Sequence, residues 1–213
     1  MLDKLKKRLI EYWQSSGIIK DKKLIEAFKA VQREKFIRDE HLSEAYGDYP
    51  LPIGLGQTIS QPTTVMLMTE ALELKEGDKV LEIGAGSGYQ AAIIAKMAGN
   101  KGKVITTEII PELAEFAQEN IKKLKIKNVK IINYDGSQGY KKEAPYNKII
   151  ITAACPQIPK PLIKQLKEDG IIIAPVGHLF GQQMIKGIKK KEKLETKSLG
   201  YFMFVPLKGK YGY

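Results

Sequence analysis

The chain has 213 residues, of which 43% are hydrophobic and 28% are charged, a balance typical of a soluble globular protein and not of a disordered chain. No apolar run approaches the roughly 20 residues that span a bilayer, and the N-terminus lacks the apolar core and cleavage site of a secretory signal. A single cysteine, Cys155, excludes an internal disulfide and a cysteine-based zinc cluster. We therefore expect a cytoplasmic protein without a metal site.

The net charge is +11, from 35 Lys and Arg against 24 Asp and Glu. Such a charge is compatible with binding to nucleic acid or acidic substrates, or with a lysine-rich solvated surface. The basic clusters "KKLKIKNVK" and "KGIKKKEKLETK" contain no aromatic side chains on which bases could stack. The surface interpretation is therefore favoured, and we expect a monomer that binds neither nucleic acid nor membrane.

The N-terminal part of the chain predicts helices around a long irregular segment. Apolar residues recur at helical spacing over residues 1–16, and again over 21–32, where Asp21 is the expected N-cap. Residues 37–62 show no sustained period and contain many Gly and Pro, which predicts a long loop of functional importance. Pro62 is expected to open a helix over residues 62–74.

From residue 79 onward, buried strands alternate with helices. The expected strands are 79–84, 102–109, 129–135, 147–154 and 170–177, and the expected helices are 89–98, 111–124 and 159–168. This order predicts an α/β fold with a mostly parallel, doubly wound sheet. Residues 182–207 predict two or three further strands that form an antiparallel edge. We expect one domain over 1–213, with a helical extension and substrate loop at 1–62, a cofactor-binding core at 63–177 and C-terminal strands at 178–213.

The stretch "VLEIGAGSGY" is the first candidate binding site. Gly84, Gly86 and Gly88 lie between a strand and a helix, where a ligand can approach the backbone closely. Glu82 lies just before them, and Glu108 and Asp135 end the next two strands. Three acidic residues favour a ligand with a ribose, an adenine amine and a positive charge, as in S-adenosylmethionine. NAD would bring a pyrophosphate that Glu82 would repel.

The second candidate is the loop "AYGDYPLPIGLGQTISQP". Together with "VLEIGAGSGYQAA", "EIIPELAEFA", "DGSQGY", "APYNKIIITAA", "IPKPLIKQLKEDGIIIAPVG" and "FVPL", it resembles the protein-L-isoaspartate (D-aspartate) O-methyltransferase family over nearly the whole chain. The resemblance implies a Rossmann-like class I methyltransferase fold with S-adenosylmethionine as cofactor. It also implies methyl transfer to isoaspartyl and D-aspartyl residues of damaged proteins and peptides, which initiates repair through a succinimide.

The same resemblance implies that Ser60 is the active-site residue, with Thr58 beside it on the loop. An isoaspartyl carboxylate is already anionic at neutral pH, so it needs a group that aligns it and no strong general base. The residues expected to bind the cofactor lie around the strand ends: Glu82, Gly84, Ala85, Gly86, Ser87, Gly88, Glu108, Ile109, Asp135, Gly136 and Thr152.

Several residues have two interpretations. Ser60 could instead be the N-cap of the next helix, and Asp48 could be a loop cap or a pocket residue. The segment "YFMFVPL" could pair with an extended substrate or be an ordinary edge strand. We expect Cys155 to be a buried, inert thiol that could line the cofactor pocket.

Three positions, Asn147, Thr63 and Met203, depart from the family pattern. We expect Asn147 to be structural and not a ligand, whereas Met203 leaves the details of substrate binding open. Two other functions also stay open: an S-adenosylmethionine-dependent methyltransferase acting on RNA or DNA, suggested by the basic charge, and a non-catalytic S-adenosylmethionine-binding protein.

Overall fold

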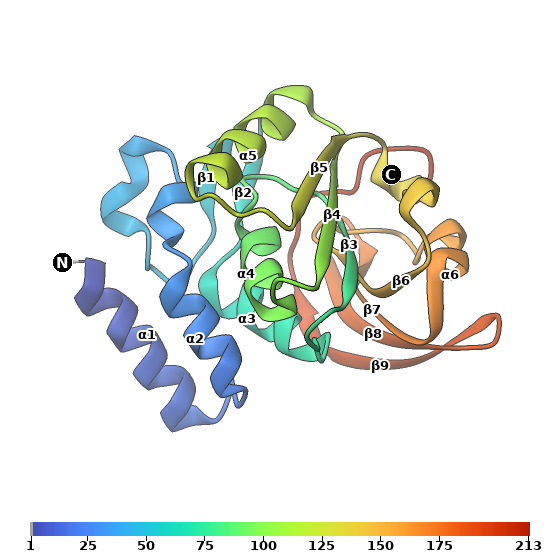
Figure 1. Cartoon of the computed structure of the whole chain (residues 1–213), viewed down its shortest axis with the longest axis horizontal. Helices are drawn as coiled ribbons and strands as arrows, with labels where there is room; N and C mark the ends of the chain where they lie inside the picture. Colours follow the sequence, from blue (N-terminus) through green and yellow to red (C-terminus); the bar gives the residue numbers. More distant parts are fainter. Residues whose placement is uncertain (1) are drawn as a thin grey trace.

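The computed structural model describes residues 2–213 and shows a central sheet with helices on both faces (Figure 1). The sheet has seven strands in the order β5-β4-β3-β6-β7-β8-β9. Their bounds are β3 Lys79–Ile83, β4 Lys103–Glu108, β5 Val129–Asn133, β6 Tyr146–Ile151, β7 Leu166–His178, β8 Gly181–Lys190 and β9 Lys193–Phe202. The predicted Rossmann-like α/β fold is therefore confirmed.

The strands from β5 to β7 run parallel, and β7, β8 and β9 pair antiparallel. The predicted antiparallel edge is thus confirmed, with two strands after β7 and a turn between Lys190 and Lys193. The chain order reverses between β3 and β6, because β4 and β5 extend the sheet on one side of β3 and β6 on the other. In open α/β sheets, ligands bind outside the carboxyl ends of the strands at such a point.

Each face of the sheet is covered by its own set of helices. Helices α3 Pro62–Ala71, α4 Tyr89–Ala98 and α5 Pro111–Lys123 cover one face, where Val80, Val104 and Ile150 lie. Helix α6 Lys160–Gln165 and Leu207 from the C-terminal tail cover the other face. Both faces are buried, which explains why the central strands read as continuous apolar runs.

The N-terminal helices α1 Leu2–Ser16 and α2 Lys22–Ala30 lie outside α4, on the far side from α6 (Figure 1). The predicted Asp21 cap is confirmed, because its side chain accepts hydrogen bonds from the amides of Lys23 and Leu24. Trp13 and Phe28 pack edge to face with ring centroids 4.7 Å apart. Among residues 2–213, no helix combines the length and apolarity that crossing a bilayer requires.

Two predicted boundaries were wrong. Residues 37–62 contain more structure than a loop: the short helix η2 Asp39–Glu44 and a hairpin of β1 Leu51–Gly54 and β2 Gln57–Ile59, which follow η1 Arg33–Phe36. Helix α6 ends at Gln165, because Leu166 already pairs with Tyr146 of β6 and begins β7. Tertiary pairing therefore overrides the helical pattern predicted to continue to residue 168.

Candidate active site

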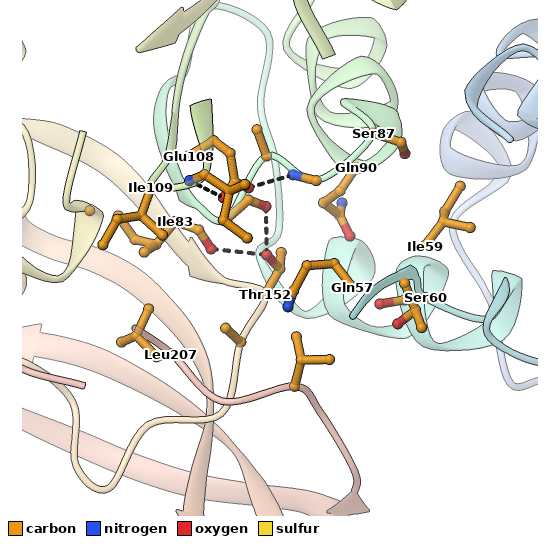
Figure 2. Close-up of a pocket in the computed structure, with 18 of the residues that line it drawn as sticks. Gln57, Ile59, Ser60, Ile83, Ser87, Gln90, Glu108, Ile109, Thr152 and Leu207 are labelled. Atoms are coloured by element: carbon orange, nitrogen blue, oxygen red, sulfur yellow. Dashed lines mark hydrogen bonds between the residues drawn. The ribbon is translucent and has the colours of Figure 1, made fainter. Parts of the chain in front are cut away.

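A pocket with an empty volume of about 870 Å³ opens at the carboxyl ends of the central strands. Its walls come from five parts of the chain: the hairpin and loop residues 57–60, helix α3, the end of β3 with the glycine loop and start of α4, the ends of β4 to β6 with the turns after them, and tail residues 205–208. Figure 2 shows Ser60 and Ile59 on one side of this pocket and Glu108, Ile109 and Leu207 on the other.

Ten of the thirteen residues expected in the site line this pocket. They are Thr58, Ser60, Gly84, Ala85, Gly86, Ser87, Glu108, Ile109, Gly136 and Thr152. The fold thus brings the substrate loop and the cofactor loop to one cavity, although they belong to different elements of the chain.

The glycine loop after β3 is shaped for close approach. Gly84 has φ +96°, and a Cβ added there would lie 2.6 Å from the Thr152 hydroxyl oxygen. That hydroxyl lies 2.9 and 2.7 Å from the carbonyl oxygens of Ile83 and Gly84, which share its single hydrogen. A side chain at position 84 would therefore displace Thr152 and occupy the space in which a ligand could approach the backbone.

Glu108 is the carboxylate best placed for a ribose. It ends β4, lines the pocket and is only 6% exposed. Its Oε2 accepts from the Gly86 amide at 2.9 Å and its Oε1 from the Ile110 amide at 3.1 Å. A carboxylate has about four acceptor positions, so the two backbone bonds orient Glu108 and leave capacity for ribose hydroxyls. These features fit S-adenosylmethionine, for which Glu108 would hold the ribose and residues 84–87 the amino acid part.

The turn after β5, which contains Gly136, forms another wall of the pocket beside the Glu108 carboxylate. A Cβ added to Gly136 would lie 2.1 Å from the Thr107 hydroxyl oxygen, so the backbone passes closer to β4 than any side chain would allow. Ile109 is 38% exposed at the pocket edge. An exposed apolar side chain beside a cavity can pack on the face of a base, which suits the adenine end of the cofactor.

Three residues expected to bind the cofactor do not line the pocket. Glu82 is fully buried, on the sheet face that carries Val80 and is covered by α3 and α4, because side chains alternate along β3. Gly88 is the N-cap of α4, and a Cβ there would meet Ala117 and Ile121 of α5. These would be ordinary contacts, and the feature that favours glycine is its φ of +86° at the start of α4.

Asp135 is the third residue outside the pocket lining. Its Oδ1 accepts from the amide and hydroxyl of Ser137, at 3.0 and 2.6 Å, and its Oδ2 from the Gln138 side chain and the Lys210 amide, at 3.0 and 2.9 Å. Burial alone would raise the pKa of Asp135, but these hydrogen bonds outweigh it and hold the pKa below its usual value. The carboxylate anchors the C-terminal tail, a role that the strand-end pattern did not predict.

Ser60 lies between β2 and α3 and lines the pocket. Helix α3 has Gln61 as its N-cap, with no side-chain capping bond, so the alternative that Ser60 caps this helix is wrong. Asp48 caps it instead: its carboxylate accepts from the Thr63 amide at 2.9 Å and the Thr63 hydroxyl at 2.6 Å. Of the two interpretations of Asp48, the structure supports the cap.

Several pocket residues were missed by the sequence reasoning. The tail residues 205–208 line the pocket but were not among the expected site residues, although the stretch "FVPL" contributed to the family resemblance. Gln90, in the stretch "VLEIGAGSGYQAA", also lines the pocket, and its amide donates to the Thr69 hydroxyl at 2.8 Å.

Cys155 does not line the pocket; it is fully buried, and burial raises the pKa of its thiol to about 12, so it is inert as expected. Asn147 is structural: its side-chain oxygen accepts from the Lys79 amide at 3.0 Å.

Comparisons with known proteins identify the family. The family model described as protein-L-isoaspartate(D-aspartate) O-methyltransferase matches residues 4–212. The chain belongs to this family. A protein-L-isoaspartate O-methyltransferase of Ignicoccus hospitalis is 49% identical over 207 residues, which cover 97% of this chain and 98% of the relative. One from Archaeoglobus fulgidus is 50% identical over 192 residues, which cover 90% of this chain and 88% of the relative.

Solved structures agree with this assignment. A protein-L-isoaspartate O-methyltransferase structure has a TM-score of 0.89 at 31% identity and covers 100% of this chain and 67% of its own. A Plasmodium falciparum protein assigned to the same enzyme class was solved in complex with S-adenosyl-L-homocysteine. Its TM-score is 0.82 at 30% identity, with 95% of this chain and 97% of that chain covered. The chain is therefore an S-adenosylmethionine-dependent methyltransferase, and nucleic-acid methylation is not favoured.

Proposed function

We propose that this chain transfers the methyl group of S-adenosylmethionine to the free carboxylate of L-isoaspartyl and D-aspartyl residues in damaged proteins and peptides. The observation that carries the proposal is the meeting of residues 57–60 with the glycine loop at one pocket, in a chain of this family. When bound, S-adenosylmethionine supplies a methyl group already activated by its sulfonium. The resulting ester cyclises to a succinimide, whose hydrolysis returns some normal aspartate.

Ser60 is proposed as the residue that aligns the acceptor. Within residues 2–213, its hydroxyl has no intramolecular hydrogen-bond partner, so it is free to donate to a carboxylate oxygen. A neutral donor holds the acceptor without the strong ground-state stabilisation that a lysine or arginine would give. Thr58, on the same loop, contributes to the same side of the pocket.

The proposed function is tested with methyl-labelled S-adenosylmethionine and two peptides that differ only in isoaspartate or normal aspartate at one position. We expect label only in the isoaspartyl peptide, released in mild base as a methyl ester. Bulk RNA serves as a third acceptor. Stable label on RNA, with none on either peptide, would contradict the assignment.

The role of Ser60 is tested with Ser60→Ala. We expect kcat to fall about 100-fold, the usual loss when one positioned donor is removed from a reacting centre. The affinity for S-adenosylhomocysteine should change less than about twofold. Because Ser60 does not cap α3, the free energy of unfolding should stay within about 0.5 kcal/mol of the wild type. A variant that retains full kcat would show that Ser60 does not align the acceptor.

We also propose that the protein works as a monomer in the cytoplasm. A single buried cysteine suits a reducing compartment, and the pocket is built from one chain. A mass of about 24 kDa in light scattering is the expected result.

A further inference from the structure

We propose that Gln57 is a second neutral donor for the acceptor carboxylate, acting beside Ser60 as a positioning residue. The proposal rests on the proposed function, because it concerns the group that receives the methyl. Neither the resemblance nor the strand-end pattern singled out this residue.

The hairpin directs the side chain of Gln57 inward. Gln57 is half-buried and lines the pocket together with Ile59 and Ser60, and the more exposed Thr58 lines it as well. A β-bulge between Pro52 and Gly54 places Gly54 opposite Gln57. Bulges beside active sites commonly re-aim a side chain.

The turn before Gln57 has an unusual backbone. Gly54, Leu55 and Gly56 all have positive φ values, of 96°, 55° and 71°. A positive φ is uncommon for a leucine and costs free energy that the surrounding structure must offset. The hairpin thus keeps a disfavoured turn directly before the residue that enters the pocket.

The Gln57 amide is available to a ligand. Figure 2 shows its side chain extending from β2 into the pocket, toward Thr152. Within residues 2–213, its nitrogen makes one hydrogen bond, to the Leu55 carbonyl oxygen at 3.5 Å, the outer limit for such a bond. By contrast, the Gln90 amide and the Thr152 hydroxyl are held by bonds of 2.7–2.9 Å.

The chemistry of the acceptor calls for such a group. A carboxylate has two oxygens, and while one attacks the methyl carbon the other must be held so that the first stays in line. The Gln57 amide offers two N–H donors without a positive charge. The lysine of the pocket lining, Lys208, is exposed to solvent.

The test uses Gln57→Leu, which keeps the approximate size and removes the donors, and Gln57→Glu, which adds a like charge. For Gln57→Leu we expect KM for the isoaspartyl peptide to rise roughly 10- to 100-fold, as for a lost hydrogen bond to a charged group. Gln57→Glu should raise this KM further at pH values above the pKa of the new carboxyl. The KM should partly recover as pH falls and that carboxyl is neutralised. The affinity for S-adenosylhomocysteine, measured by calorimetry, should change less than about twofold in both variants.

Gln61→Leu is the matched control, because Gln61 lies four residues away, makes no capping bond and does not line the pocket. An unchanged KM in Gln57→Leu overturns the inference while the proposed function stands. A loss confined to S-adenosylhomocysteine affinity also overturns it, because Gln57 would then contact the cofactor. If the wild-type protein does not methylate the isoaspartyl peptide, the proposed function fails and this inference fails with it.

Discussion

Glu82 is a buried carboxyl group in the centre of the sheet. Neither of its oxygens has a hydrogen-bond partner among residues 2–213. Burial raises the pKa of Glu82 to about 8; the neighbouring Thr106 hydroxyl opposes this rise and the nearby charge of Glu108 adds to it. The group is therefore protonated in the folded protein at neutral pH, whereas in the unfolded chain it ionises near pH 4.5.

This difference predicts a pH-dependent stability. Between about pH 4.5 and 8 the unfolded chain binds fewer protons at this position than the folded one, so Glu82 lowers the free energy of unfolding as pH rises. Glu82→Gln removes the titration. We expect its free energy of unfolding, relative to wild type, to increase by a few kcal/mol from pH 5 to pH 8, as measured by urea unfolding. A relative stability that is flat over this range would mean that Glu82 is ionised in the folded state.

At the scale of elements, the start of α3 links the substrate loop to the N-terminal helices. The Thr63 hydroxyl donates to Asp48 and accepts from the indole N–H of the fully buried Trp13 at 2.7 Å. Ser60 lies three residues earlier, so these bonds fix the base of the loop that carries it. Sequence reasoning marked Thr63 only as a departure from the family pattern.

Thr63→Val should therefore destabilise the protein. The substitution keeps the size of the side chain but leaves the fully buried Trp13 N–H without its partner, which costs about 1–3 kcal/mol, whereas the exposed Asp48 can bind water instead. We expect a loss of about 2 kcal/mol or more in urea unfolding. Thr64→Val is the control: Thr64 is also buried but makes no side-chain hydrogen bond among residues 2–213, so its loss should be within about 0.5 kcal/mol. Equal losses in both variants would rule out the proposed anchoring.

Elements with their own periodicity were predictable, and those that depend on distant partners were not. Continuous apolar runs gave β3, β4 and β6, and helical spacing with Asp21 gave α2. The β1–β2 hairpin is rich in Gly and Pro, and its pairing is visible only in three dimensions. The end of α6 was missed for a similar reason, since Leu166 joins the sheet through its pairing with Tyr146.

For the whole molecule, the pocket joins residues from the N-terminal third of the chain with residues near its C-terminus. Residues 57–60 and 205–208 form parts of its wall, although about 150 positions separate them. The glycine loop could be predicted because a strand, a glycine triplet and a helix are adjacent in sequence. The tail could not, because nothing local indicates that its Lys210 amide binds Asp135 or that the Leu207 amide binds the Ala154 carbonyl oxygen at 2.7 Å.

The tail should therefore control how tightly the cofactor is held. Deleting residues 209–213 removes the bonds of the Lys210 and Tyr211 amides to Asp135 and Ser137 and leaves residues 205–208 less constrained. Cofactor binding must then order this wall again, at about 1–2 kcal/mol for each residue fixed. We expect the Kd for S-adenosylhomocysteine to rise about 10-fold or more, measured by calorimetry. Lys210→Ala is the control, because it keeps the backbone amide and should bind as the wild type does. An unchanged Kd in the deletion would show that residues 205–208 hold their position without the last five residues, and that Asp135 anchors a segment with no part in cofactor binding.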